Sequence, residues 1–185
     1  EGARLALCDI REDELANRAR QLEAPVENLL CSAVDMREKE QVEAFVAKAF
    51  ANFGRIDVLV NNVGGGRRGR VQDLGDEDWR YVLDLSLGSV FLASRAAMPH
   101  LAAVRGNIVN IASISGLAGD GGNVAYNAAK GAVVNMTRGM AVDAGPDGVR
   151  VNAICPGLTA TPMTERMRAS ETVMQQYGDR IPLGR

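Results

Sequence analysis

The chain has 185 residues, of which 46% are hydrophobic and 24% charged, a composition that suits one globular domain, 1–185, with its own core. Its 21 basic and 23 acidic residues leave a net charge of −2, which provides no field to hold nucleic acid or a membrane surface. The three cysteines lie in short apolar runs and no uncharged run spans a membrane, so we expect a cytoplasmic protein that binds small molecules.

Short apolar runs typical of strands alternate with longer helical stretches along the chain. The expected strands, rich in Val, Ile, Leu or Ala as in strands buried on both faces, are 4–8, 29–34, 56–60, 107–111 and 149–155. The expected helices are 11–22, 38–53, 76–104 and 123–144. This alternation predicts an α/β fold in which helices cover both faces of a parallel sheet.

Each expected strand is followed by a polar residue or a glycine. These strand-end residues are Asp9, Asp35, Asn61 to Gly64, Ser113 and Pro156-Gly157. Any one of them alone is an ordinary turn residue. Ligands of parallel sheets bind at the carboxyl ends of the strands, so together they predict one ligand site.

Tyr126 and Lys130 are four residues apart on an expected helix and therefore share one face. A phenol with a pKa of about 10 transfers protons poorly at neutral pH unless a nearby cation stabilises the phenolate. Lys130 can supply that cation, and Ser113 can donate a hydrogen bond to a substrate carbonyl. The three residues predict a proton-transfer site, whereas Tyr126 and Lys130 alone would be typical of a surface pair.

The strand-end residues and this pair, in their order and spacing, resemble the short-chain dehydrogenase/reductase family. The match runs through nearly the whole chain and includes Asp9, Asp35-Met36, Asn61 to Gly64, Asn110 to Ser113, Tyr126 to Lys130 and Pro156 to Met163. The resemblance implies a Rossmann-type, doubly wound sheet. It also implies that Tyr126 exchanges the alcohol proton during hydride transfer, that Ser113 polarises the carbonyl, and that Lys130 binds the nicotinamide ribose.

The same resemblance implies the cofactor contacts. Asp9 would bind the adenosine ribose and repel a 2′-phosphate, so NAD is expected in preference to NADP. Asp35 and Met36 would flank the adenine. The other contacts implied by the motifs are Asn62 and Gly64 on the ribose side, with Pro156, Gly157, Thr159 and Thr161 at the carboxamide end. For each of these, a strand-end turn or cap is the simpler interpretation.

Two features depart from the family pattern. Ser86 stands where an asparagine usually supports a water leading to the lysine, so Ser86 is a candidate member of a proton relay. The chain also lacks the family's first strand-helix unit, with its glycine-rich phosphate loop, and the last strand. We therefore expect an internal fragment of a longer protein, which the resemblance implies is a homotetramer.

Three further segments have alternative interpretations. The glycine- and arginine-rich stretch 64–70 predicts a flexible loop at the substrate mouth, whose arginines would favour an anionic substrate, rather than a nucleic-acid site. His100 follows Pro99 at an expected helix interruption and lacks partners at ligand spacing, so no metal site is expected. Residues 161–177 predict an amphipathic helix, which in the family is a lid over the substrate.

The stretch 116–135 resembles butanediol dehydrogenases and acetoin reductases. That branch implies a small vicinal diol or hydroxyketone as substrate. Two alternatives stay open: a ketoreductase acting on acyl chains attached to a carrier protein, and a non-catalytic NAD-binding regulator, which Ser86 would suit.

Overall fold

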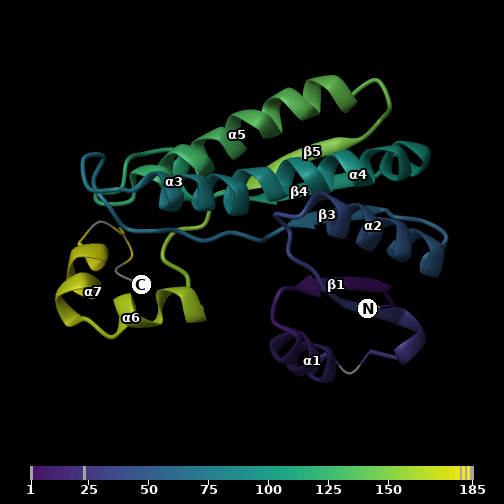
Figure 1. Ribbon diagram of the computed structural model, residues 1–185, viewed down its shortest axis with the longest axis horizontal. Helices are drawn as coiled ribbons and strands as arrows, with labels where there is room; N and C mark the ends of the chain where they lie inside the picture. Colours follow the sequence, from purple (N-terminus) through teal and green to yellow (C-terminus); the bar gives the residue numbers. More distant parts are fainter. Residues whose placement is uncertain (1, 23, 180, 182, 184–185) are drawn as a thin grey trace. The chain divides into compact units, whose positions relative to one another are not determined.

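The computed structural model describes residues 2–22, 24–179, 181 and 183. The chain forms two compact units, 1–155 and 156–185; the expectation of one domain stays a prediction. In the first unit strands and helices alternate as predicted (Figure 1). In chain order they are β1 (Leu5–Asp9), α1 (Glu12–Gln21), β2 (Leu29–Ala33), α2 (Lys39–Phe53), β3 (Val58–Asn61), α3 (Asp76–Leu83), α4 (Ser89–Val104), β4 (Asn107–Ile111), α5 (Val124–Ala144) and β5 (Arg150–Ile154).

The strands pair in parallel, as expected. β1 pairs with β2, and β4 lies between β3 and β5 in a separate three-stranded sheet. In the larger sheet Asn61 aligns with Asn110, and Ile111 with Ile154. Parallel register brings the carboxyl ends of β3, β4 and β5 to one edge, where Gly64 and Ser113 follow their strands.

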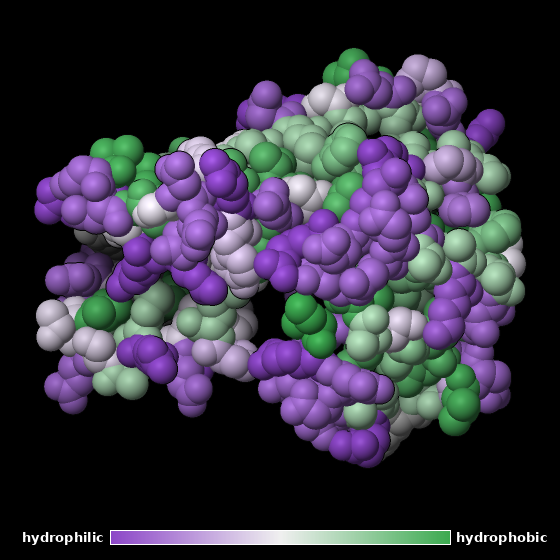
Figure 2. All heavy atoms as spheres, in the orientation of Figure 1, coloured by the Kyte–Doolittle hydropathy of each residue, from purple (hydrophilic) through white to green (hydrophobic). Residues whose placement is uncertain are grey.

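Helices lie on both sides of the sheets (Figure 1). α1 packs on β1 and β2, while α4 and α5 pack on the three-stranded sheet. There Leu101, Ile108 and Val151 share a core cluster. The outer sides of these strands differ from the expectation of burial on both faces, since Val58 and Val60 are 53% and 55% exposed. The helices α2, α4 and α5 lie on the same side of the three-stranded sheet (Figure 1). On the surface, apolar patches lie between charged side chains (Figure 2).

The expected helix 76–104 is divided by a π-helical turn, Asp84–Gly88. Pro99, by contrast, lies inside α4 without ending it, so the predicted interruption at that residue was wrong. The Ser89 hydroxyl donates to the Leu85 carbonyl at 2.5 Å, which satisfies a carbonyl beside the widened turn. Such turns are frequent at functional sites.

The whole stretch Asp76–Val104 is long and apolar enough to cross a membrane by length and composition alone. Its residues Val82, Val90 and Leu101 are nevertheless fully or almost fully buried in the protein core. In all, 33% of the apolar window of this stretch is buried.

The second unit contains short helices where one continuous helix was expected. A 3₁₀ turn, Pro162–Thr164, is followed by α6 (Glu165–Arg168) and α7 (Glu171–Gly178). The break falls at Ser170, which has an extended backbone. Its Oγ caps α7 by accepting the Val173 N–H at 3.4 Å. The capping serine thus explains why the amphipathic pattern does not form a single helix.

Candidate active site

Ser113, Tyr126 and Lys130 come together at the carboxyl end of β4. Ser113 lies two residues after the end of that strand and is 8% exposed, while α5 carries Tyr126 and Lys130 on one face. The Lys130 Nζ lies 5.8 Å from the centre of the Tyr126 ring and donates a 2.6 Å hydrogen bond to the Ile111 carbonyl. The Ser113 Oγ accepts the Ser115 N–H at 3.1 Å, so its own proton stays available for donation.

Burial sets the electrostatics of this group. It raises the pKa of Tyr126, and an interaction with the Ser113 hydroxyl opposes part of that rise. It lowers the pKa of Lys130 to about 8, against a smaller opposing effect of Cys155. A desolvated ammonium acts through a lower effective dielectric than a surface lysine does. Lys130 is therefore suited to stabilise the phenolate form of Tyr126, which burial disfavours.

Three glycines bring their backbone against these side chains. A Cβ on Gly64 would lie 3.1 Å from the Lys130 Nζ, and one on Gly65 would lie 3.1 Å from Leu85 Cδ2. A Cβ on Gly66 would lie 3.6 Å from Tyr126, an ordinary contact distance. A side chain at Gly64 would therefore crowd the Lys130 ammonium, which glycine avoids.

Ser86 lies in the π-helical turn and is fully buried. Its Oγ donates to the Gly65 carbonyl at 2.8 Å and accepts the Gly65 N–H at 3.1 Å. The residue predicted as a relay member therefore contacts the glycine loop directly.

A buried polar network behind the site was missed by the sequence interpretation. The Asn61 Nδ2 donates to Asn110 Oδ1 at 2.8 Å and to Ser94 Oγ at 3.1 Å, and Asn110 Nδ2 donates to Thr137 Oγ1 at 2.9 Å. These bonds join β3, β4, α4 and α5. The signal was present in the sequence, since asparagines inside apolar strands need buried partners.

Replacing Thr137 with valine is expected to lower the free energy of unfolding by about 1–3 kcal/mol, because the Asn110 amide would lose its acceptor in the core. Urea denaturation measures the loss. Thr137→Ser keeps the hydroxyl and is expected to retain more stability. Unchanged stability in Thr137→Val would show that the hydrogen bond from Asn110 does not stabilise the fold.

Comparison with known proteins identifies this arrangement. A family model described as enoyl-(acyl carrier protein) reductase matches residues 1–185. The meso-2,3-butanediol dehydrogenase of Serratia marcescens is 40% identical over 185 residues, covering 100% of this chain and 72% of that protein. The chain belongs to the short-chain dehydrogenase/reductases. The resemblance seen in the motifs, including the butanediol dehydrogenase-like branch, is confirmed.

Two further members of this family agree. The 3-oxoacyl-[acyl-carrier-protein] reductase of Thermotoga maritima is 35% identical over 188 residues, covering 100% of this chain and 75% of that protein. A crystal structure of gluconate 5-dehydrogenase from Burkholderia cenocepacia, in complex with NADP and tartrate, has a TM-score of 0.90 at 30% identity. It matches 100% of this chain and 72% of that one. The protein is thus an oxidoreductase of the short-chain dehydrogenase/reductase family.

Short-chain dehydrogenase/reductases bind a nicotinamide cofactor, and the described residues fit one. Asp9 ends β1 with its side chain 42% exposed, while its Oδ1 accepts the Arg11 N–H at 2.9 Å. Because Gly64 has no side chain, no side chain at that position covers the Lys130 ammonium. Lys130 uses one of its three N–H donors on Ile111, which leaves two for ribose hydroxyls.

The side chains predicted to flank the adenine already make protein contacts. The Asp35 carboxylate pairs with Arg37 at 2.5 Å, and this contact lowers the Asp35 pKa. Met36 is 9% exposed and packs in a core cluster, where its sulfur lies 3.6 Å from that of Cys8. Their roles toward a cofactor stay predictions, as does that of Asn62, which is exposed after β3.

The remaining predicted contacts lie in the second unit. Thr159 and Thr161 are joined by Thr164, whose Oγ1 donates to the Thr159 carbonyl at 2.6 Å and accepts the Thr161 N–H at 3.2 Å. Pro156 and Gly157 begin this unit. The organising residue, Thr164, was missed because its partners are backbone groups that the sequence pattern does not reveal.

The arginines of the glycine loop have partners in the protein. Arg67 lies 3.4 Å from Asp78, with its guanidinium 4.3 Å from the centre of the Tyr81 ring, and Arg70 lies 3.6 Å from Asp73. These ion pairs involve two of the loop's three arginines, and the expectation of an anionic substrate stays a prediction.

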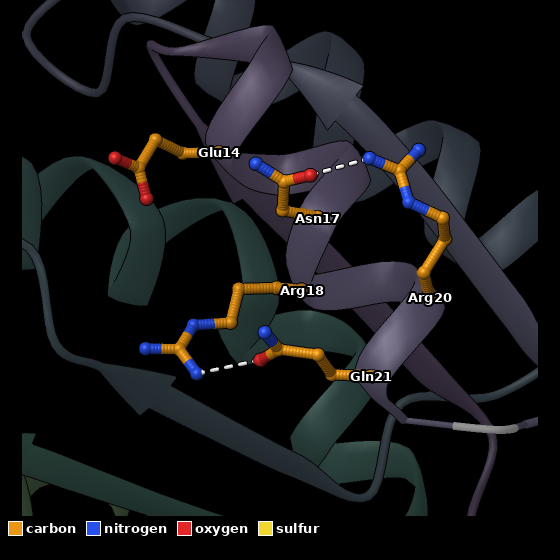
Figure 3. A pocket seen from close by; sticks show the side chains of 5 residues that line it. All are labelled: Glu14, Asn17, Arg18, Arg20 and Gln21. Atoms are coloured by element: carbon orange, nitrogen blue, oxygen red, sulfur yellow. Dashed lines mark hydrogen bonds between the residues drawn. The ribbon is translucent and has the colours of Figure 1, made fainter.

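Two other features lie outside this site. His100 stacks on Phe50 with ring centres 4.2 Å apart, which gives it a packing role. Figure 3 shows a surface hollow formed by side chains of α1 alone, from Glu14 to Gln21, and none of the predicted site residues lines it.

Proposed function

We propose that the protein interconverts a small secondary alcohol and its ketone, with NAD preferred over NADP and a vicinal diol or hydroxyketone as substrate. The observation that carries the proposal is the buried group of Ser113, Tyr126 and Lys130, in which Lys130 has a pKa of about 8. The 40% identity to a meso-2,3-butanediol dehydrogenase supports the choice of substrate.

The bound cofactor would supply or accept the hydride. The Tyr126 Oη takes the alcohol proton in oxidation and returns it in reduction. Ser113 donates a hydrogen bond to the same substrate oxygen, since its other contact uses a lone pair. Lys130 favours the ionised form of Tyr126 through its buried charge and offers its free N–H groups to the nicotinamide ribose.

A carrier-protein ketoreductase remains the second candidate. The 35% identity to a 3-oxoacyl-[acyl-carrier-protein] reductase favours it, and the catalytic group would be the same. Asp9 argues against it, because a carboxylate beside the adenosine ribose disfavours the NADP that such enzymes generally use.

The experiment is an initial-rate assay of the full-length protein, with NAD or NADP for oxidation of diols, hydroxyketones and cyclic alcohols, and with NADH or NADPH for reduction of hydroxyketones and an acetoacetyl thioester. Highest kcat/KM with NAD and a diol or hydroxyketone supports the proposal. Highest kcat/KM with NADPH and the thioester replaces it with the ketoreductase. NAD binding without turnover of any compound favours a regulator.

Replacing Asp9 with serine is expected to raise the ratio of kcat/KM for NADP to that for NAD by about 10- to 100-fold, which corresponds to losing one charge-assisted hydrogen bond. Arg11, whose Nε lies 3.7 Å from the Asp9 carboxylate, would then be free to meet the 2′-phosphate. Initial rates with both cofactors measure the ratio. Asp13→Ser, on the exposed part of α1, is the control, and an unchanged ratio in Asp9→Ser would contradict the role of Asp9.

We further propose a cytoplasmic location and a homotetramer. The free cysteines at positions 8, 31 and 155 support a reducing compartment. The family resemblance supports the tetramer, which sedimentation of the full-length protein would test.

A further inference from the structure

We propose that Ser86 is a positioning residue: it holds Gly64 to Gly66, the first part of the glycine loop 64–70, against Lys130 and Tyr126, and does not pass protons. The inference rests on the proposed function, because it concerns the geometry of that site. The observation behind it is the pair of hydrogen bonds between one buried hydroxyl and both polar backbone groups of Gly65.

The bonding of Ser86 leaves its hydroxyl no proton to hand on. A hydroxyl has one donor and two lone pairs. Ser86 gives its proton to the Gly65 carbonyl at 2.8 Å and one lone pair to the Gly65 N–H at 3.1 Å. A relay through Ser86 would require the first of these bonds to break in the core at every turnover, leaving a buried carbonyl unpaired.

The position of the loop matters because its fit is tight. The site where a Cβ of Gly64 would lie is 3.1 Å from the Lys130 Nζ and 3.5 Å from the Ser86 Oγ. Gly65 has the Leu85 side chain equally close on its other side. A methyl group at Gly64 would therefore crowd the Lys130 ammonium, which shows that the loop backbone runs next to this lysine.

A second contact holds the glycine loop at Gly69, near the start of α5. The Gly69 N–H donates to the Gly122 carbonyl at 2.9 Å, at an isolated bridge between Gly69 and Asn123. Asn123 precedes α5, which carries Tyr126. Ser86 fixes the end of the loop beside Lys130, and this bridge fixes the end near the start of α5.

The π-helical turn explains how the hydroxyl reaches the loop. Ser86 is the middle residue of Asp84–Gly88 and is fully buried. Ser89, three residues on, is also buried, but it bonds only to the Leu85 carbonyl of its own helix. Ser89→Ala is therefore a matched control, because it removes a buried serine hydroxyl from the same helix without touching the loop.

The first test compares Ser86→Ala with Ser89→Ala in the full-length protein. Ser86→Ala is expected to raise the KM for the alcohol and lower kcat, each by about 10-fold, with the pH profile and solvent isotope effect of the wild type. Ser89→Ala is expected to change neither constant more than about twofold. An unchanged KM with a lower kcat and a larger solvent isotope effect would assign Ser86 to a relay and overturn the proposal.

A second variant covers the case in which Ser86→Ala does not fold. Gly65→Ala keeps the serine and shifts the loop from its other side, against Leu85. It is expected to reproduce the rise in KM. An unchanged KM in a Gly65→Ala protein whose Gly65 amide exchanges faster than in the wild type would contradict the proposal, because the loop would have moved without affecting the site.

Amide hydrogen exchange separates this inference from the proposed function, because it requires no turnover. Loss of the Ser86 acceptor is expected to raise the exchange rate of the Gly65 amide at least about 10-fold, while Ser89→Ala leaves it unchanged. An unchanged exchange rate of the Gly65 amide in Ser86→Ala would refute the role of Ser86 in holding the loop. A wild type that turns over no substrate would refute the proposed function alone.

Discussion

Replacing Tyr126 with phenylalanine is expected to lower kcat for alcohol oxidation by about 10³-fold or more, with little change in cofactor affinity. The substitution removes the only atom that exchanges the proton, and general acid-base catalysis contributes about 10²–10⁴-fold. The ring keeps its packing against the core cluster of Val82, Ala125 and Ala129. Stopped-flow and steady-state rates, together with NADH titration, measure the two quantities.

Tyr81→Phe is the matched control for this variant. Tyr81 is a partly buried phenol in the same cluster, stacked with Arg67 rather than placed beside Lys130. We expect it to retain activity within about twofold. If Tyr126→Phe also kept most of its kcat, another group would be the acid-base.

Replacing Lys130 with methionine is expected to reduce kcat/KM by about 10²–10³-fold, the cost of removing one electrostatic donor from a buried site. The loss should appear in both kcat and KM for NAD, because the ammonium is proposed to stabilise the phenolate and to bind the ribose. Steady-state kinetics give both constants. A change in kcat alone would remove the ribose contact from the proposal.

The same variant tests the pKa of Lys130. Its pKa is about 8 in the folded chain and 10.5 ordinarily, so the unfolded chain binds more protons between these values. Stability of the wild type is therefore expected to rise with pH relative to Lys130→Met across that window, by at most about 3 kcal/mol. Denaturation at several pH values measures the difference.

Cys8 also titrates near this range, because burial and Asp9 raise its pKa to about 11. Its contribution is present in both proteins and cancels in the difference. A difference that stays constant with pH would contradict a depressed Lys130 pKa.

The sequence predicted the elements that depend on local pattern. Strands rich in branched residues and helices ending at signals such as Gly54, which has a φ of +73°, lie close to their expected bounds. The Tyr126 and Lys130 pair was predictable because helical spacing alone puts both on one face. Ser113 followed from its place after a strand.

Features that depend on contacts between residues far apart in the sequence were not predictable. Asn110 reads as a polar residue in a strand, and only the fold places it beside Asn61 and Thr137. The contact of Ser86 with a loop from another part of the chain is likewise visible only in the fold. The acidic partners of Arg67 and Arg70 were also not predicted from the sequence.

The central claim is that this site transfers hydride from an alcohol carbon with Tyr126 as the proton acceptor. The most direct test uses a diol deuterated at its carbinol carbons, with NAD and the full-length protein, and analyses the nicotinamide by mass spectrometry. We predict that deuterium reaches the nicotinamide C4 with the wild type and that Tyr126→Phe transfers at most a trace. Binding of NAD with no label transferred from diols or other alcohols of the assay panel would contradict the account.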